Sequence, residues 1–500
     1  MPDFTPTAEQ THIADLFRDG STLKVRAGAG TGKTSTLLLL ADVLAEQNRL
    51  GLYVAFNKAI ATEAGRKFGN HITAKTAHAM AFAGIRNTRH ADLLDKMRGN
   101  RIPFWVTREQ IGIRAATITG SDNTPRRLSA GAITKHALRT VDTFCTTADT
   151  DIRPEHVPTM PGIDWPGQRH NHRALIDIVL PYAKAVWRDL TDPRGTAVAF
   201  SHGHYLKLWA MEHPVIGRPG GALFIDEAQD ISPVMADVFD RQTHLQRVVV
   251  GDSAQSIYGF TGAIDYMSTT PAEHEGRLTQ SWRFGQAIAD AANELLTELG
   301  DDLRLTGNPG RDSRIEPGLA LADAILTRSN ASALIHVMAA QRAGRPVCLM
   351  GDIKQSLAFC DGAEKLLNGE RVFTGDLEAF ESWAQVVEYA EEAPGASDWK
   401  VLVALIEEHT VNDVRNALSS TVPENQAEVI VSTAHKSKGR EWGTVRLDSS
   451  LAESVEDARE REFDVLRDEL MLAYVAVTRA QHVLDPSLLF DDAPTKSTVA

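Results

Sequence analysis

Residues 23–34 read LKVRAGAGTGKT, an apolar run followed by a glycine-rich turn that ends in Lys33 and Thr34. Glycine loses more backbone freedom on ordering than any other residue, so such a turn needs a compensating interaction. Phosphate oxygens supply one, because the N–H groups of the turn and of the next helix start converge on an anion. We therefore predict a nucleoside triphosphate site, rather than a glycine-rich loop without a ligand, built from Ala27, Gly28, Ala29, Gly30, Thr31, Gly32, Lys33, Thr34 and Ser35.

A second stretch, GALFIDEAQD at residues 221–230, places Asp226 and Glu227 at the end of an apolar strand. Such a pair suits ATP hydrolysis, because one carboxylate joins the Mg²⁺ shell and the next orients and deprotonates the attacking water. Thr34 is the expected hydroxyl ligand of the same Mg²⁺. The alternative is an acidic pair that only begins a loop. Together with the glycine-rich turn, the pair favours ATP and Mg²⁺ as cofactors.

The overall composition is that of a folded protein with no strong positive charge. Hydrophobic residues make up 43% of the 500 residues, and 66 acidic residues against 52 Lys and Arg give a net charge of -14. This charge argues against uniform coating of nucleic acid. Widely spaced Cys145, Cys348 and Cys360 support neither a disulfide framework nor a zinc site. With no signal-peptide pattern and no long apolar run, we expect a cytoplasmic protein without a membrane segment.

Short β-branched runs alternate with helical stretches along the chain, which is typical of parallel sheets covered by helices. These runs include LGLYVAFN, RVVVGD, AEVIVSTAH and TVRLDS, and they form two groups. We expect one α/β domain at residues 1–85 and 205–280 and a second at 281–372 and 425–486. Residues 86–204 have no clear strand pattern and are interpreted as a helical insertion. A shorter insertion is expected at 373–424 and a flexible tail at 487–500.

Further blocks follow the acidic pair in a fixed order. They are GDSAQSIYGF, LTQSWRFGQ, VSTAHKSKGREW and MLAYVAVTRAQ, with YVAFNKAIATEA and TAKTAHAMAFA earlier in the chain. Together with DEAQD, this set resembles the superfamily 1 helicases of the UvrD/Rep type. It looks closest to the F-box DNA helicase branch and its phage and bacterial relatives, although no F-box is present. The resemblance implies two RecA-like P-loop domains, each with a parallel sheet and a mainly helical insertion.

The resemblance also assigns roles around the nucleotide. It implies that Gln10 reads the adenine edge, that Trp282 stacks on the base and that Glu441 contacts the ribose. It further implies that Gln255 couples the γ-phosphate to the moving parts and that Arg283 and Arg479 are arginine fingers, whose guanidinium groups neutralise charge on the transferred phosphoryl group. The alternatives are a surface role for the arginines, core packing for Trp282 and a helix cap for Gln10.

Single-stranded nucleic acid is gripped by aromatic platforms and backbone donors rather than by net charge. The resemblance implies such contacts from Phe56, Asn57, Lys58, Thr76, His78, Tyr258, Phe260, Thr433, His435 and Lys436. Core packing is the alternative for the aromatic members. Thr261 stands where the family usually has arginine, which removes a positive group from this track.

The function that these patterns favour is an ATP-dependent DNA helicase or translocase, which by resemblance moves 3′ to 5′ on single-stranded DNA. We expect single-stranded DNA or a single/double-strand junction as its partner, in repair, recombination or replication within a bacterial or phage-infected cell. One alternative is a translocase that removes bound proteins without unwinding. Another is a non-hydrolysing, ATP-dependent DNA-binding module. The pattern leaves protein partners open.

Overall fold

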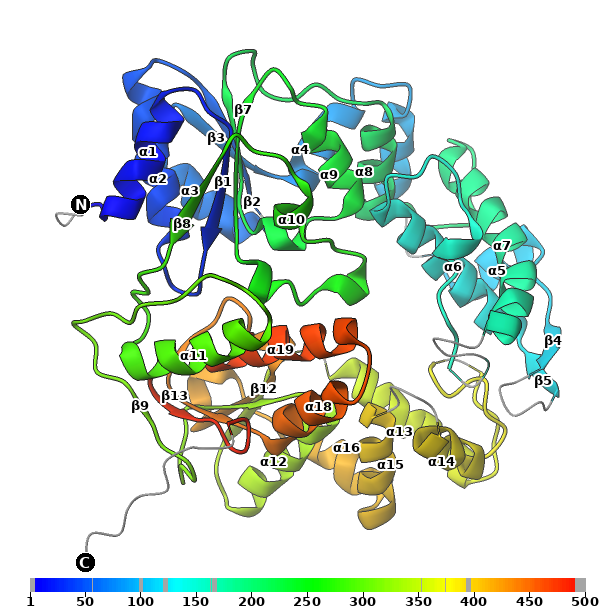
Figure 1. Ribbon diagram of the computed structural model, residues 1–500. Coiled ribbons are helices and arrows are strands. Elements are labelled where there is room, and N and C mark those ends of the chain that lie inside the picture. The colour runs from blue at the N-terminus through cyan, green and yellow to red at the C-terminus, as the bar shows by residue number, and fades with distance from the viewer. Residues whose placement is uncertain are drawn as a thin grey trace, which may run out of the picture.

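The computed structural model describes residues 5–55, 57–98, 102–119, 125–161, 163, 169–351, 353–373, 375–392 and 397–490. Two α/β lobes lie one above the other (Figure 1). The first lobe contains a parallel six-stranded sheet in the order β3-β2-β6-β7-β1-β8. Its strands are β1 (Leu23–Ala27), β2 (Gly51–Ala55), β3 (Ile72–Thr76), β6 (Ala222–Ile225), β7 (Gln246–Gly251) and β8 (His274–Leu278). Its helices include α1 (Ala8–Arg18), α2 (Lys33–Glu46), α3 (Lys58–Lys67), α4 (Ala77–Ile85), α9 (Pro233–Asp240) and α10 (Tyr266–Thr269).

The second lobe contains another parallel six-stranded sheet, in the order β11-β12-β10-β13-β14-β9. Its strands are β9 (Arg314–Ile315), β10 (Ala324–Thr327), β11 (Val347–Leu349), β12 (Val429–Thr433), β13 (Trp442–Leu447) and β14 (Ala480–Asp485). Its helices include α11 (Gln286–Glu298), α12 (Asn330–Arg342), α17 (Ala434–Ser437), α18 (Ser449–Arg459) and α19 (Phe463–Val477). The predicted fold class, two α/β units with parallel sheets, is confirmed.

The first insertion leaves the sheet after β3 and returns at β6. It consists of α5 (Phe104–Ile111), α6 (Ala130–Thr146), α7 (Arg169–Thr191) and α8 (His202–Met211), with a 3-10 helix at Ala91–Arg98. It also contains an antiparallel hairpin of β4 (Ala116–Thr119) and β5 (Pro125–Leu128). The prediction that this region lacks strands was wrong at the hairpin. Each strand is short, and Ile118 and Leu128 are its only buried hydrophobic members among the described side chains, so the alternating pattern is too weak to detect.

The second insertion lies between β11 and β12, which are neighbours in the sheet. It contains α13 (Lys354–Leu367), α14 (Trp383–Glu392), α15 (Ser397–Glu408) and α16 (Val411–Ser419), so the helical excursion begins before residue 373. The two insertions touch, because Ser129 at the start of α6 donates to Glu378 and Lys135 lies 3.7 Å from Asp376. The predicted tail is described only to residue 490. In the described part of the chain, no helix is both long enough and apolar enough to span a membrane.

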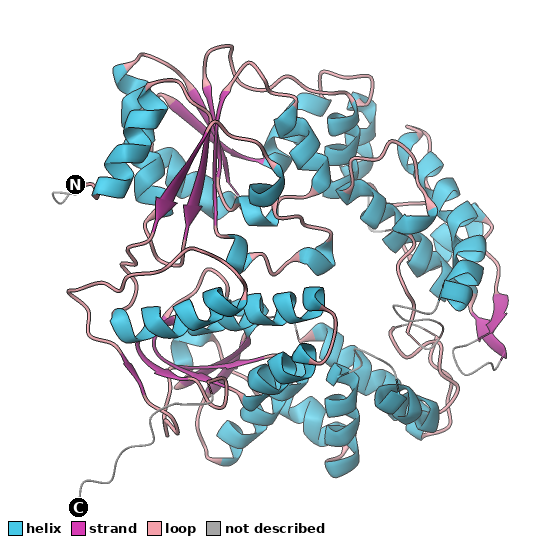
Figure 2. Cartoon of the chain, in the orientation of Figure 1, coloured by secondary structure: helices cyan, strands magenta, loops and turns pink. Residues whose placement is uncertain are grey.

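Strand direction determines where a ligand can bind. The carboxyl ends of β1, β2, β6 and β7 lead into the loops that contain Gly28, Asn57, Asp226 and Asp252. Figure 2 shows the strands of the upper sheet pointing toward the lower lobe. In open α/β sheets, ligands bind at the carboxyl ends of the strands. The cleft between the lobes is therefore the expected site.

The insertion core supplies a prediction about pH. His136 on α6 is buried and hydrogen-bonded to the Pro158 carbonyl at 2.6 Å, and burial lowers its pKa from 6.5 to about 4. The unfolded chain takes up a proton near pH 6.5 that the folded chain does not accept until about pH 4, so acidification destabilises the fold. Between pH 7 and pH 5 this group should remove about 2 kcal/mol of unfolding free energy.

Denaturant unfolding at both pH values checks this. His136→Gln should lose about 2 kcal/mol less than the parent on acidification, whereas His12→Gln, at an exposed position on α1, should follow the parent. Equal acid sensitivity of the parent and His136→Gln would contradict the assignment.

Candidate nucleotide site and nucleic-acid track

The glycine-rich turn connects β1 to α2 and approaches the second lobe closely. Gly30 and Gly32 have φ of +73° and +86°, in the left-handed region that favours glycine. A Cβ on Gly30 would lie 2.7 Å from Arg283 Cβ and 2.8 Å from Ser281 Oγ. The Gly30 carbonyl accepts a hydrogen bond from the Trp282 N–H at 2.8 Å. These glycines therefore shape the turn and also allow the second lobe to approach it.

Lys33 begins α2 and lies among carboxylates. Its Nζ is 3.3 Å from Glu227 Oε2. Burial alone would lower the pKa of Lys33, but Glu227, Asp252 and Asp226 outweigh burial and raise it. Burial would raise the pKa of Glu227, but Lys33, Lys438 and the hydrogen bond from Gln229 together outweigh burial and lower this pKa to about 2. The lysine is charged and Glu227 is ionised in the cleft.

The acidic pair is held by hydrogen bonds at the end of β6. Asp226 Oδ2 accepts from the Tyr53 hydroxyl at 2.7 Å, and its Oδ1 accepts from the Glu227 N–H at 2.9 Å. Burial and the neighbouring Glu227 raise the pKa of Asp226. Glu227 has φ of +51° and accepts from Gln229 Nε2 at 2.6 Å. The same carboxylate faces Lys33, so Glu227 is held by both Gln229 and Lys33.

The second lobe contributes Arg283 and Arg479 to the same cavity as Lys33, a 360 Å³ space also lined by Thr34, Glu227 and Gln255. Arg479 is fully buried, and its Nη2 donates to Gln255 Oε1 at 3.3 Å. Burial and the nearby Arg283 lower the pKa of Arg479 to about 9. Gln255 is held in turn by its Nε2, which donates to Asp252 at 2.6 Å. The two predicted arginine fingers therefore face the predicted phosphate site.

The residues predicted for the adenine and ribose gather at the edge of this turn. Gln10 completes the capping box of α1 with Thr7, and its Nε2 donates to Thr36 at 3.1 Å. Both Gln10 and the half-exposed Trp282 would lie within 4 Å of a Cβ on Gly32. The carboxylate of Glu441 accepts from Arg283 Nε at 2.6 Å and from Gln481 at 2.7 Å.

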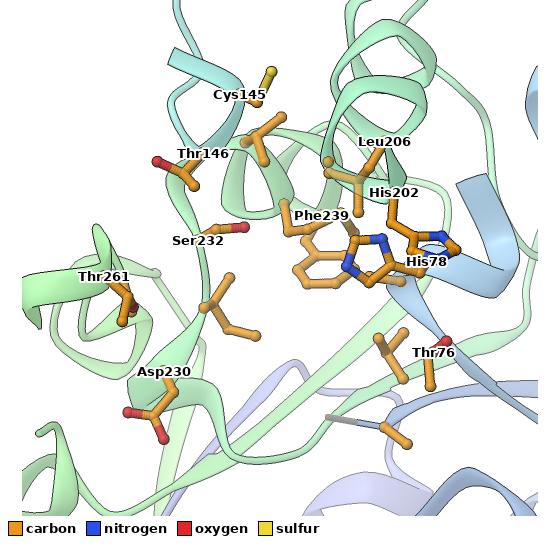
Figure 3. Close-up of a pocket in the computed structure, with 18 of the residues that line it drawn as sticks. Thr76, His78, Cys145, Thr146, His202, Leu206, Asp230, Ser232, Phe239 and Thr261 are labelled. Carbon is orange, nitrogen blue, oxygen red and sulfur yellow. The ribbon is translucent and has the colours of Figure 1, made fainter. Parts of the chain in front are cut away.

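The predicted DNA contacts divide among three places. Thr76 and His78 line a 510 Å³ cavity between the first lobe and its insertion, where the His78 ring lies 6.1 Å from that of His202 (Figure 3). Asn57 and Tyr258 line the nucleotide cavity instead. Lys58 is exposed at the start of α3, and Phe56 lies outside the described residues.

The third place is the interface between the lobes. Phe260 is 75% exposed, and its ring contacts that of His435 of the second lobe edge-on at 5.5 Å. Thr433 is buried and caps α17, while Lys436 Nζ donates to Asn330 at 2.7 Å. A buried position leaves Thr433 little surface for a strand, although its predicted role stays open.

Comparison with known proteins identifies the family. A family model described as an AAA domain matches residues 10–261, about half of the chain, and one described as the UvrD-like helicase C-terminal domain matches residues 365–488. This chain belongs to the UvrD-like superfamily 1 helicases. F-box DNA helicase protein 1 of Schizosaccharomyces pombe is 28% identical over 537 residues, covering 98% of this chain and 58% of that protein.

Two further relatives agree. F-box DNA helicase 1 of Gallus gallus is 29% identical over 526 residues, covering 96% of this chain and 48% of that protein. DNA helicase IV of Escherichia coli (strain K12) is 24% identical over 322 residues, covering 55% of this chain and 45% of that protein. The chain spans about half the length of these relatives. The resemblance to UvrD-like superfamily 1 helicases that the motifs indicated is confirmed, whereas a bacterial or phage origin stays a prediction.

Two residues of the cleft were not predicted from the sequence. Lys438 lines the nucleotide cavity, donates to Asp230 across the cleft and donates to the Gln255 carbonyl at 2.5 Å. Tyr474 donates to Asp252 at 3.2 Å and accepts from the Ala29 N–H at 3.2 Å. Both lie in the quoted blocks, but a short motif does not reveal which side chain crosses a cleft.

The close approach at Gly30 predicts a defect that backbone strain alone does not cause. Gly30→Ala should lose about 1–3 kcal/mol of stability through its φ and should also weaken nucleotide binding, because the new Cβ displaces the segment with Arg283. Gly69→Ala is the matched control, since Gly69 has φ of +68° and a Cβ added there would meet no atom within 4 Å. Thermal unfolding and binding of a fluorescent ADP check both effects. Equal ADP affinity in the two variants would contradict the prediction.

Proposed function

We propose that this chain is a DNA-stimulated ATPase that moves 3′ to 5′ along single-stranded DNA and separates strands at a single/double-strand junction. One observation carries the proposal: Arg283 and Arg479 of the second lobe line the same cavity as Lys33 of the first. ATP bound there would contact both lobes at once. Hydrolysis would then remove the shared contact and let the lobes separate, which is the motion that a translocase requires.

The residues of the cleft match the demands of phosphoryl transfer. Lys33 would bind the β and γ oxygens, and the two arginines would stabilise charge on the transferred group. Glu227 is ionised and its side chain is 29% exposed, so its carboxylate can reach and orient a water molecule. Thr34 and Asp226 offer a hydroxyl and a carboxylate, a donor set that suits Mg²⁺. When bound, Mg²⁺ would neutralise charge on the phosphates.

The nucleotide cavity and the cavity near His78 share a wall, which supports coupling between ATP and DNA. Asp230 lines both cavities, and Lys438 of the second lobe contacts Asp230 across the cleft. A change in lobe position therefore acts on a side chain that also borders the proposed DNA track. Phe260 and His435 come from opposite lobes and would contact the DNA strand at the interface. A change in lobe position would therefore alter their grip on the DNA as well.

Steady-state ATPase assays with and without single-stranded DNA test the proposal. The parent should be strongly stimulated by DNA, and Lys33→Ala should lose both nucleotide binding and turnover. Arg479→Ala should lower kcat about 10³-fold while retaining nucleotide binding better, since the finger acts on the transition state. Arg479→Lys keeps the positive charge but lacks the guanidinium group, so its kcat should lie between those of the parent and Arg479→Ala.

Arg459→Ala is the matched control, because this arginine of the same lobe pairs with Glu298 at 3.0 Å on the surface. Its turnover should equal that of the parent. Thermal unfolding of each variant separates a catalytic loss from unfolding. A parent whose ATPase ignores DNA, or an Arg479→Ala variant with normal kcat, would overturn the proposal.

Direction and unwinding need separate substrates. A duplex with a 3′ single-stranded tail should be separated with ATP, and one with a 5′ tail should not. On single strands, streptavidin should be displaced from a 5′ biotin but retained on a 3′ biotin. Displacement of streptavidin with an intact duplex would favour a translocase that only removes proteins. ATP-dependent binding without hydrolysis would favour a binding module.

A further inference from the structure

Tyr53 has a buried hydroxyl whose partner is Asp226, which lines the cavity near His78 and directly precedes Glu227 of the nucleotide cavity. It lies within β2, all of whose residues are buried, and is itself 1% exposed. Its ring contacts Phe68 at 5.0 Å between centroids, which a phenylalanine would also do. Its hydroxyl donates to Asp226 Oδ2 at 2.7 Å. Burying a hydroxyl is costly unless it is hydrogen-bonded, so this bond accounts for the tyrosine.

The pairing of two strands fixes this contact. β2 and β6 are parallel neighbours, with Tyr53 opposite Phe224 and Val54 opposite Ile225. Asp226 follows directly after β6, so the Tyr53 side chain reaches forward to its carboxylate. The backbone N–H of Glu227 holds the other oxygen. Two hydrogen bonds at opposite oxygens prevent the carboxylate from rotating, while a carboxylate offers about four acceptor positions and keeps room for a cation.

We propose that Tyr53 is a positioning residue that orients Asp226 for Mg²⁺. The inference rests on the nucleotide site of the proposed function and adds a residue that none of the motifs places there. Groups that hold a metal ligand in place affect metal affinity strongly, although they do not touch the metal. β2 also leads directly to Asn57 and Lys58 of the predicted DNA track, so the same hydroxyl links that strand to the metal ligand.

Tyr53→Phe tests the role, because it removes the hydroxyl and retains the ring. The main measurement is Mn²⁺ binding to the protein in the presence of ADP, monitored by water proton relaxation. It does not depend on ATPase activity. Tyr53→Phe should bind Mn²⁺ about tenfold more weakly than the parent. The affinity for ADP without metal should be unchanged. In ATPase assays, added Mg²⁺ should restore much of kcat.

Tyr266→Phe is the matched control in the same lobe. Tyr266 is also 1% exposed, and its hydroxyl donates to Asp240 at 2.6 Å. Neither residue lines the nucleotide cavity or the cavity near His78. It should lose similar thermal stability and bind Mn²⁺ normally. Asp226→Asn should lose Mn²⁺ binding and shows the loss of affinity expected when the metal ligand itself is removed.

Mn²⁺ affinity of Tyr53→Phe within twofold of the parent would overturn the role, and so would an equal loss in Tyr266→Phe. The Mn²⁺ titration does not require turnover. A parent that binds Mn²⁺ with ADP but hydrolyses no ATP would sink the proposed function and leave the Tyr53 role to be decided by its own variant.

Discussion

Buried opposite charge between two lobes is the constraint on which this structure depends. Lys33 forms an ion pair with Glu227 of its own lobe. Lys438 of the second lobe instead pairs with Asp230 of the first. Arg479 likewise donates a hydrogen bond to Gln255 across the cleft. A buried charge without a partner is expensive, so each lobe needs the other to satisfy groups that it carries. The cleft is therefore held together by groups that line the nucleotide cavity.

Contacts made by α19 also join the glycine-rich turn to the second lobe. Tyr474 and Arg479 lie at the end of α19 and just after it, and Tyr474 contacts both Ala29 of the glycine-rich turn and Asp252. Any phosphate that shifts the turn therefore acts on the helix that places the arginine. The glycines serve this contact as well, since a side chain at Gly30 would meet Arg283. The turn is adapted to a facing lobe as much as to phosphate.

Local spacing was enough to predict the parts of the site that lie next to one another in the chain. The glycine-rich turn, Lys33 and the acidic pair each belong to a strand and the loop after it, so periodicity and spacing locate them. Tyr53 and Lys438 are different, because their roles arise from strand order and lobe contact, which no local pattern encodes. Asn57 and Tyr258 line the nucleotide cavity, and their contacts with DNA stay a prediction. A motif identifies a loop, whereas the fold decides which of two adjoining cavities its side chains enter.

The two adjoining cavities share a buried carboxylate. Asp230 borders both, and burial raises its pKa to about 6 even though Lys438 opposes this effect. Its Oδ1 is buried without a hydrogen-bond partner among the described groups. A carboxylate so poorly compensated is sensitive to small movements of the cation that contacts it, Lys438 of the second lobe. Closure of the lobes around a nucleotide would therefore move Lys438 relative to Asp230, which borders both cavities. This effect would be electrostatic and would not need a long chain of contacts.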